Sequence, residues 1–396
     1  MKELNLVKKM KNNVKSVLLV IIFALIMLLN AEFIKMNNYF AYAKNDAKTS
    51  AKAMLVMDVN SGRVLYSKND NEKLPMASTT KIITAIVAIE NNDDLERLVE
   101  IDDEMTGIEG TSIYLKKGEH LTIRELLYGL MLRSGNDSAI AIAKATSGSV
   151  DAFMDLANNF CKNIGACDTN LTNPHGLPDD NHYTTARDLA LISSYAMKNV
   201  EFAKIVNTKQ KTIQNELNSS KKRVLNNKNK LLKNMEIANG IKTGYTKKAG
   251  RCFVGSATYN DMTLVCVLLN CNPMFEECKM LLENAFSEYK NIELVKADEV
   301  VGELKVENGI KDTVKITAGT GAIVPLKVSE VDDVNIVYDV PACITDPFSA
   351  GDVVGKFDIY VSNHLIFSGK IYIIEDVYIK EPSVGNEIIK DFVHLD

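Results

Sequence analysis

The chain has 396 residues, a length that favours two to three domains. Hydrophobic residues make up 46% and charged residues 24%, which excludes a disordered or fully membrane-embedded protein. The 46 basic side chains against 51 acidic ones give a formal net charge of −5, so nucleic acid is not expected as a partner.

The first 43 residues have the pattern of an export signal. Lysines cluster among residues 2–15, and the apolar run 17–29 that follows is too short to span a bilayer. Ala41-Tyr42-Ala43 places small residues at the two positions that a signal peptidase reads, so we predict cleavage after Ala43 and an exported mature chain. An uncleaved anchor is the alternative.

Seven cysteines occur in the chain, and their spacing is not typical of a metal site. None of them forms a Cys-x-x-Cys pair, and no histidine lies near enough to complete a zinc pattern. A chain of this length can build a large core without crosslinks, so we expect buried, reduced thiols. We predict no metal and no cofactor.

The apolar patterning predicts strands, then a run of helices, then strands again. Two strands, over 53–58 and 62–67, are joined by the turn Asn60-Ser61-Gly62. Helical periodicity is present over residues 79–90, 121–131, 137–145, 151–164 and 185–197. Strands over 241–243, 252–259 and 262–270 follow, with a helix over 276–290. This order predicts an α/β layered domain whose sheet joins strands from both ends of the domain.

The composition changes after about residue 290. Short Val/Ile-rich runs over residues 313–317, 335–338, 356–361 and 370–374 alternate with Gly, Asp and Asn turns, which predicts a separate all-β module. The sequence of the last residues, 381–396, predicts a short helix or tail. That segment either packs on its own domain or makes peripheral contact with a membrane surface.

Ser78-Thr79-Thr80-Lys81 places a serine and a lysine three residues apart where a helix is predicted to begin. Positions i and i+3 share a helix face, so the Lys81 amine can reach the Ser78 hydroxyl. A serine needs a base to become a good nucleophile, and a buried lysine beside another cation has the lowered pKa that suits this task. The backbone N–H of Ser78 would be free to face an oxyanion. By itself, the pattern also fits an ordinary helix cap at Ser78.

Ser134-Gly135-Asn136 lies between two predicted helices, where a short loop can present side chains into a cleft. Ser134 would relay a proton to a leaving amine. Asn136 has both a donor and an acceptor, enough to hold a substrate amide and the amine of Lys81. A turn with a helix cap is the alternative.

Lys242-Thr243-Gly244 lies on a predicted strand. Lys242 would place a positive charge beside the nucleophile, and Thr243 would offer a hydroxyl to a substrate carboxylate. Gly244 would let a substrate backbone lie against the strand. An edge-strand lysine without a role is the alternative. Each motif is weak alone, but the three in this order are typical of class A β-lactamases and penicillin-binding proteins.

The sequence resembles the low-molecular-mass penicillin-binding proteins, the serine D-Ala-D-Ala carboxypeptidases, over residues 51–377. Further segments that resemble family signatures are residues 75–81, 173–177, 185–190, 227–232 and 240–246, with 347–377 resembling the C-terminal β domain. The resemblance implies a β-lactamase/DD-peptidase-like antiparallel sheet flanked by helices, plus a smaller all-β C-terminal domain. The segments would be a signal peptide (1–43), a catalytic domain (44–290), a β-rich domain (291–380) and a terminal helix or tail (381–396).

The resemblance also implies a reaction. Ser78 would form an acyl-enzyme with the penultimate D-Ala of a peptidoglycan stem peptide, with Lys81 as general base. Ser134 and Asn136 would shuttle the proton and hold the peptide, and Lys242 and Thr243 would bind the terminal carboxylate. The backbone N–H groups of Ser78 and Tyr245, beside Gly244, would form the oxyanion hole. β-Lactam antibiotics would acylate Ser78, and the protein would act at the cell wall or the outer face of the cytoplasmic membrane.

One feature departs from the family pattern. Many relatives carry an arginine after the strand that follows the third motif, and residues 271–276 hold none. His175 and His182 are candidate acid–base groups, but the motif already supplies a lysine base, so we expect structural roles for them.

Two other functions share some of these features. A class A β-lactamase should have Asp as the middle residue of the second motif and a glutamate on a later loop. Here Gly135 takes that place, and residues 146–189 contain no glutamate, which argues against rapid β-lactam hydrolysis. A non-catalytic cell-wall binding protein could use the β-rich module and the basic stretch 209–233.

Overall fold

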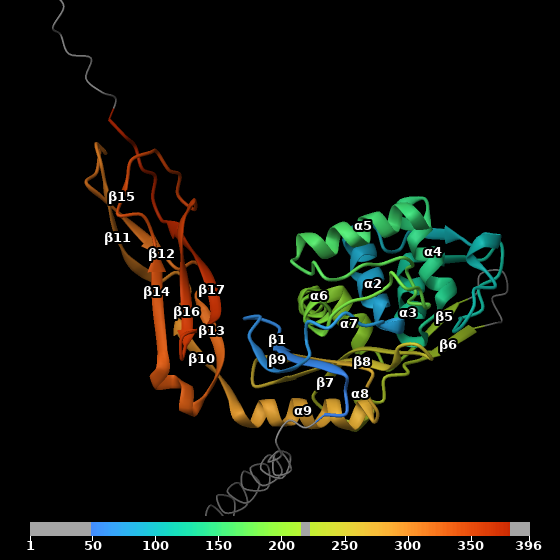
Figure 1. Ribbon diagram of the computed structural model, residues 1–396. Helices are drawn as coiled ribbons and strands as arrows, with labels where there is room; N and C mark the ends of the chain where they lie inside the picture. Colours follow the sequence, from blue (N-terminus) through green and yellow to red (C-terminus); the bar gives the residue numbers. More distant parts are fainter. Residues whose placement is uncertain (1–48, 215–221, 381–396) are drawn as a thin grey trace, which may run out of the picture. The chain divides into compact units, whose positions relative to one another are not determined.

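The computed structural model describes residues 49–214 and 222–380, so the predicted signal peptide and the segment 381–396 lie outside the described residues. The described chain divides into two compact units (Figure 1). The first contains Tyr66–Ala257 and Val265–Glu288 with the residues up to Val56. The second contains Met57–Leu65, Thr258–Leu264 and the chain from Tyr289 onward.

A five-stranded sheet runs through the first unit in the order β2-β1-β9-β8-β7. Its strands are β1 (Ala53–Asp58), β2 (Val64–Lys68), β7 (Ala238–Thr246), β8 (Gly250–Tyr259) and β9 (Met262–Leu269). The first strand lies beside a late one, as the sequence predicts for a sheet that joins both ends of the domain. The strand β7 lies at the sheet edge and pairs antiparallel with β8, and it also packs against η1 and α7.

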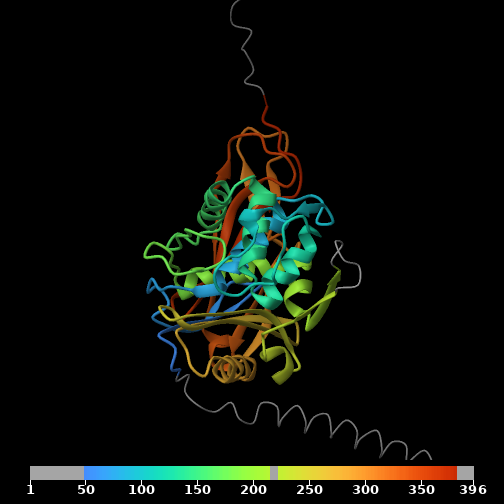
Figure 2. The ribbon, with the colours of Figure 1, turned by 90° about the vertical axis from the view of Figure 1, so that its right-hand side faces the viewer.

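Helices cover both faces of this sheet, with α9 (Met274–Glu288) along one face and a cluster of helices on the other (Figures 1 and 2). The cluster comprises the 3₁₀ helix η1 (Ala77–Thr80), α2 (Lys81–Glu90), α3 (Ile123–Arg133), α4 (Asn136–Ser147), α5 (Val150–Asn163), α6 (Ala186–Lys198) and α7 (Val200–Asn207). In α2 the residues from Lys81 to Ala88 are all buried, and a helix that is apolar all round belongs in a core. The nucleophile motif therefore lies at the start of the central helix.

Side-chain caps explain where several of these helices begin. The Thr122 hydroxyl accepts a hydrogen bond from the Glu125 N–H, and the Glu125 carboxylate accepts one from the Thr122 N–H, a capping box that starts α3. Ser149 caps α5 and Thr185 caps α6, and each side chain accepts one hydrogen bond from a backbone N–H. These caps fix the starts of α3, α5 and α6, whereas α4, which follows the second motif, begins without a side-chain cap.

Short elements complete the first unit. They are η2 (Asp103–Met105), the hairpin of β3 (Leu98–Glu100) with β4 (His120–Thr122), the hairpin of β5 (Gln210–Gln214) with β6 (Lys222–Asn226), and α8 (Leu231–Asn234). The buried Glu119 carboxylate forms an ion pair with Arg223 of β6 at 2.7 Å. This ion pair links the loop before β4 to the second hairpin.

The second unit is built of strands, which confirms the predicted all-β module. A six-stranded sheet has the order β14-β16-β17-β12-β11-β15, and β10 pairs with β13 in a second sheet. The bounds are β10 (Tyr289–Val295), β11 (Val300–Val306), β12 (Thr313–Thr317), β13 (Ala322–Lys327), β14 (Val334–Asp339), β15 (Cys343–Ile344), β16 (Val353–Val361) and β17 (His364–Ile373), with η4 (Val328–Asp333) between two of them. Alternating residues such as Val314, Ile316, Phe357 and Ile359 form its core.

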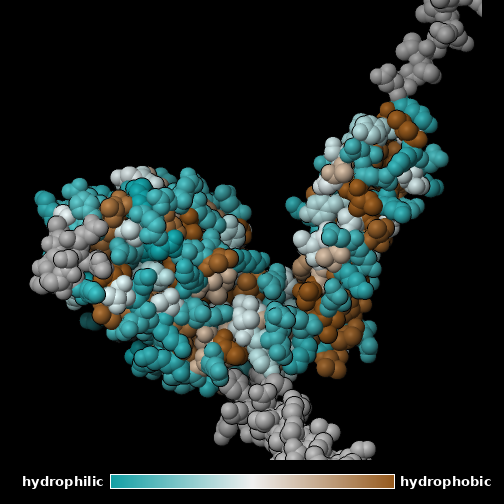
Figure 3. Space-filling view, turned by 180° about the vertical axis from the view of Figure 1, so that it is seen from behind, coloured by the Kyte–Doolittle hydropathy of each residue, from teal (hydrophilic) through white to brown (hydrophobic). Residues whose placement is uncertain are grey.

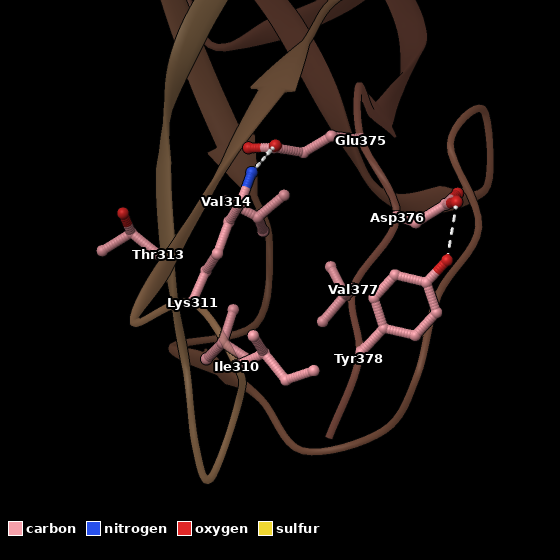
Figure 4. Close-up of a pocket in the computed structure, with 9 residues that line it drawn as sticks. Ile310, Lys311, Thr313, Val314, Glu375, Asp376, Val377 and Tyr378 are labelled. Atoms are coloured by element: carbon pink, nitrogen blue, oxygen red, sulfur yellow. Dashed lines mark hydrogen bonds and ion pairs between the residues drawn. The ribbon is translucent and has the colours of Figure 1, made fainter. Parts of the chain in front are cut away.

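A pocket of about 270 Å³ lies in this second unit (Figure 4). Lys311 forms an ion pair with Glu375 there, and the Tyr378 hydroxyl donates to Asp376 at 3.1 Å. Hydrophobic residues also reach the surface of this unit (Figure 3), with Val328 84% exposed. None of the three sequence motifs belongs to this unit, so the pocket is separate from them.

All seven cysteines lie in the described part of the chain as free thiols. Cys167 and Cys343 are exposed, and the remaining five are buried: Cys161, Cys252, Cys266, Cys271 and Cys278. Burial raises the pKa of Cys161 to about 12 and that of Cys252 to about 11, which keeps both as unreactive thiols. No helix within residues 49–214 and 222–380 has both the length and the apolar character of a membrane span.

Candidate active site

The first motif occupies a tight turn at the entry to the central helix. Ser78 lies in η1, and Lys81 is the first residue of α2. The Lys81 Nζ is 3.0 Å from the Ser78 Oγ, so the structure brings together the two side chains that the spacing predicted to share a face. Ala77, directly before the serine, has a left-handed backbone with φ of +49°.

The Lys81 amine is fully buried and makes two short hydrogen bonds besides its contact with Ser78. It donates to the Asn136 Oδ1 at 2.7 Å and to the backbone carbonyl of His175 at 2.6 Å. Burial holds the pKa of Lys81 well below its usual value, and the charges of Lys242 and Lys228 lower it further. A lysine in this setting loses its proton far more readily than one in water.

The second motif forms the turn between α3 and α4. Ser134 ends α3 in a left-handed conformation with φ of +64°, and Asn136 begins α4. The Asn136 backbone N–H donates to the Thr111 carbonyl at 2.7 Å, and its Nδ2 donates to the Glu109 carbonyl at 2.5 Å. One of the two N–H groups of Asn136 Nδ2, which was expected to hold a substrate amide, therefore has a partner within the protein.

A buried carboxylate, Asp137, supports this turn. Its oxygens accept hydrogen bonds from the backbone N–H groups of Ile113 at 3.1 Å and Leu115 at 3.0 Å, and from the Ser112 hydroxyl. These bonds hold the 112–115 segment beside α4. Asp137 was not predicted as a residue of the site, although its place directly after Asn136 is a signal that the sequence carries.

The third motif, on β7, packs against the first. A Cβ added to Gly244 would lie 2.9 Å from the Ser78 backbone nitrogen and 3.1 Å from that of Thr79. Only glycine allows so close an approach. Gly244 was expected to make room for substrate, but in the structure its α-carbon faces the backbone of the nucleophile turn.

The other residues of the third motif differ in burial. Lys242 is 2% exposed, and burial together with the charge of Lys228 lowers its pKa to about 7. Thr243 is half-buried. Tyr245 is 63% exposed, with the Arg251 guanidinium 5.7 Å from its ring centroid.

Both candidate histidines are buried, and their rings hold backbone or hydroxyl groups. The His175 Nδ1 accepts from the Leu177 N–H at 3.2 Å, and burial lowers its pKa to about 3. The His182 Nδ1 accepts from the Thr172 N–H at 3.1 Å, and burial lowers its pKa to about 4. Both imidazoles are therefore neutral near pH 7. The group of His175 that accepts a hydrogen bond from Lys81 is its backbone carbonyl and not its ring.

Lys228 is a third cation near Lys81 and Lys242, and it was not predicted from the sequence. Its charge lowers the pKa values of both Lys81 and Lys242, and burial lowers its own. The segment 227–232 resembles a family signature, but the resemblance predicted no role for this lysine. The described residues contain no cluster of three or more His, Cys, Asp or Glu side chains that could hold a metal ion.

Comparisons with known proteins agree with this arrangement. The sequence pattern of the family described as D-alanyl-D-alanine carboxypeptidase matches residues 40–272. The pattern described as penicillin-binding protein 5, C-terminal domain, matches residues 289–378. The first match contains all three motifs, and the second covers the part of the strand-rich unit that begins at Tyr289.

Similar proteins extend over most of the chain. D-Alanyl-D-alanine carboxypeptidase DacF of Bacillus subtilis is 29% identical over 351 residues, which are 85% of this chain and 90% of the relative. DacC of Escherichia coli is 30% identical over 342 residues, which are 83% of this chain and 84% of the relative. The solved structure of penicillin-binding protein 5 from Haemophilus influenzae has a TM-score of 0.73 at 28% identity, covering 84% of this chain and 99% of that one.

These matches confirm the predicted fold class, an α/β catalytic unit followed by an all-β domain. They cover both units and include a relative that is 30% identical over more than four fifths of each chain. The chain belongs to the D-alanyl-D-alanine carboxypeptidase family.

Proposed function

We propose that this protein is a serine carboxypeptidase that removes the terminal D-Ala from peptidoglycan stem peptides. Ser78 Oγ attacks the carbonyl carbon of the penultimate D-Ala, the peptide bond breaks, and D-Ala leaves with a proton on its amine. Water then hydrolyses the ester and frees Ser78. The observation that carries this proposal is the buried Lys81 amine, 3.0 Å from the Ser78 Oγ.

The hydrogen bonds of Lys81 support its role as the base. A neutral amine has two N–H groups and one lone pair. The Asn136 Oδ1 and the His175 carbonyl can only accept, so they take the two N–H groups. The lone pair is left to face the Ser78 hydroxyl, which is the orientation that proton abstraction requires.

The oxyanion that forms on attack is stabilised by the backbone N–H groups of Ser78 and Tyr245. The close approach of Gly244 to the Ser78 nitrogen supports this assignment, because it places the β7 backbone beside the nucleophile turn. Donors fixed in this way are worth about 10²- to 10³-fold in kcat each. Ser134 returns the proton from Lys81 to the leaving amine, and Asn136 orients Lys81.

The terminal carboxylate of the substrate binds to Lys242 and the Thr243 hydroxyl. Lys228 adds a second positive charge to this subsite, since its charge already acts on Lys242. Two cations beside a substrate with one terminal carboxylate account for recognition of a free C-terminus.

The proposal extends to ligands and location. β-Lactam antibiotics carry a reactive amide and a carboxylate, so they acylate Ser78 through the same contacts. Deacylation is slow, because residues 146–189 offer no glutamate to activate water. Because peptidoglycan lies outside the cytoplasmic membrane, the protein acts extracytoplasmically, at the cell wall or the outer face of that membrane, after export by the predicted signal.

The test is D-Ala release from a diacetylated Lys-D-Ala-D-Ala peptide by purified protein, with Ser78→Ala as the control. We expect D-Ala release and a covalent penicillin adduct with wild type, and neither with Ser78→Ala. An adduct that persists in Ser78→Ala would exclude the serine mechanism. Fast penicillin turnover without peptide cleavage would favour a β-lactamase, and stable peptidoglycan binding without either reaction would favour a cell-wall binding protein.

A further inference from the structure

The peptide group between Ala77 and Ser78 is held in an unusual conformation. Ala77 is 2% exposed and adopts a left-handed backbone, which is unfavourable for a residue with a Cβ. Its carbonyl and the N–H of Ser78 belong to the same planar peptide unit. Whatever fixes the direction of the Ala77 carbonyl therefore also fixes the direction of the Ser78 N–H.

The Ala77 carbonyl is fixed from two sides. The Thr80 hydroxyl donates to it at 2.8 Å. Gly176, from the loop after α5, packs so tightly that an added Cβ would lie 2.0 Å from the same oxygen. This steric contact closes one side of the carbonyl, and the hydroxyl bond sets its orientation on the other.

The Thr80 hydroxyl in turn contacts His182. The two atoms, Thr80 Oγ1 and His182 Nε2, are 2.8 Å apart, and the residues are 0% and 3% exposed. A hydroxyl has a single hydrogen, and Thr80 gives it to the Ala77 carbonyl, so it must accept from His182. The His182 Nδ1 accepts the Thr172 backbone N–H, which places the ring proton on Nε2.

We propose that His182 and Thr80 are positioning residues that orient the Ser78 N–H toward the oxyanion through the Ala77 carbonyl. The hydrogen bonds run in one direction, from the Thr172 N–H through the imidazole and the Thr80 hydroxyl to that carbonyl. Neither side chain touches the substrate. This inference rests on the proposed function of Ser78.

Paired substitutions distinguish the effect of this hydrogen-bond chain, which we call the relay, from the effect of packing around Thr80 and His182. Thr80→Val removes the hydroxyl with little change in shape, and Thr80→Ser keeps it. At His182, asparagine can still accept the Thr172 N–H through its Oδ1 but cannot reach Thr80, whereas glutamine restores a donor near the Nε2 position. Thr169→Val is the control, since it removes a buried hydroxyl that bonds Thr184 and Asp188 instead.

We expect Thr80→Val and His182→Asn to lower kcat for D-Ala release about 10- to 100-fold, less than loss of a whole oxyanion donor. KM should change less than about twofold, because the oxyanion exists only in the transition state. Thr80→Ser and His182→Gln should stay within about threefold of wild type, as should the control. Acylation by a fluorescent penicillin should follow the same order.

Three results would overturn this positioning role. The first is an active wild type whose kcat is matched by Thr80→Val and His182→Asn. The second is a loss of kcat in these two variants that Thr80→Ser and His182→Gln share. The third is a ¹⁵N NMR spectrum of the wild type that shows the His182 proton on Nδ1. Failure of the proposed function would instead appear as wild-type protein that releases no D-Ala. The NMR measurement determines which His182 nitrogen carries the proton, and it does not depend on activity.

Discussion

The Lys81 Nζ and the Asn136 Oδ1 lie 2.7 Å apart in the interior of the first unit, which joins the first motif to the second. Because Asn136 is itself anchored through its backbone to Thr111 and through its amide to Glu109, the lysine amine has a fixed direction. In the proposed mechanism, proton abstraction from Ser78 depends on this fixed amine.

Lys81→Met should lower the rate of Ser78 acylation about 10²- to 10⁴-fold, the range that general-base catalysis supplies. The substitution removes the base but keeps an apolar chain of similar length in a buried place. Acylation is followed by mass spectrometry after mixing with penicillin. Lys144→Met, which removes a lysine paired with Asp102 and Glu104, serves as control and should react like wild type.

The pH dependence of kcat/KM should have two limbs. Lys81 must be neutral to act as base, so the acid limb reports its lowered pKa. Lys242 must be charged to bind the carboxylate, and its pKa of about 7 makes activity fall as the pH rises above that value. Lys242→Arg should shift the alkaline limb upward, since arginine stays charged. An unchanged alkaline limb in this variant would assign that limb to another group.

Gly244→Ala should disrupt the nucleophile turn. The new Cβ would lie 2.9 Å from the Ser78 nitrogen, so either β7 or the turn must move. We expect acylation to fall about 100-fold, comparable to losing an oxyanion donor, and stability to fall by about 1–3 kcal/mol. The control is Gly302→Ala, whose Cβ would meet only the Ile316 side chain at 3.9 Å. Urea unfolding and acylation kinetics measure the two effects.

Lys228→Ala should weaken recognition of the substrate carboxylate. We expect kcat/KM for the tripeptide to fall about tenfold, while Lys228→Arg keeps it, because arginine retains the charge. An amidated peptide lacks the carboxylate, so its already slow cleavage should not fall further in Lys228→Ala. Equal losses for both peptides would show that Lys228 acts elsewhere.

Much of the fold follows from local patterns in the sequence. Residues 53–58 form the predicted strand with every residue buried, and the helix predicted over 185–197 is α6, started by the Thr185 cap. The helix predicted over 276–290 ends two residues early, at Glu288. Tyr289 begins β10 instead, where its buried ring lies under Arg63 and Lys327, contacts between distant segments that periodicity cannot reveal.

The helix α7 (Val200–Asn207) was not predicted, because it is short and follows α6 after a single residue. Asn199 ends α6 and caps α7 by accepting from the N–H groups of Glu201 and Phe202. The order of the three motifs predicted the residues of the site, because serine acylation requires a hydroxyl nucleophile, a base and a group that binds a carboxylate. The contact of Asn136 with the Glu109 carbonyl was not predictable, since any residue supplies a backbone carbonyl.

The exposure of the cysteines makes the natural sequence suitable for fluorescence energy-transfer measurements. Cys167 of the first unit and Cys343 of the second are exposed, whereas the other five thiols are buried. Maleimide dyes should therefore attach at these two positions in the natural sequence. Energy transfer between a donor and an acceptor would then follow the separation of the two units in solution, with and without penicillin, and no cysteine would have to be introduced.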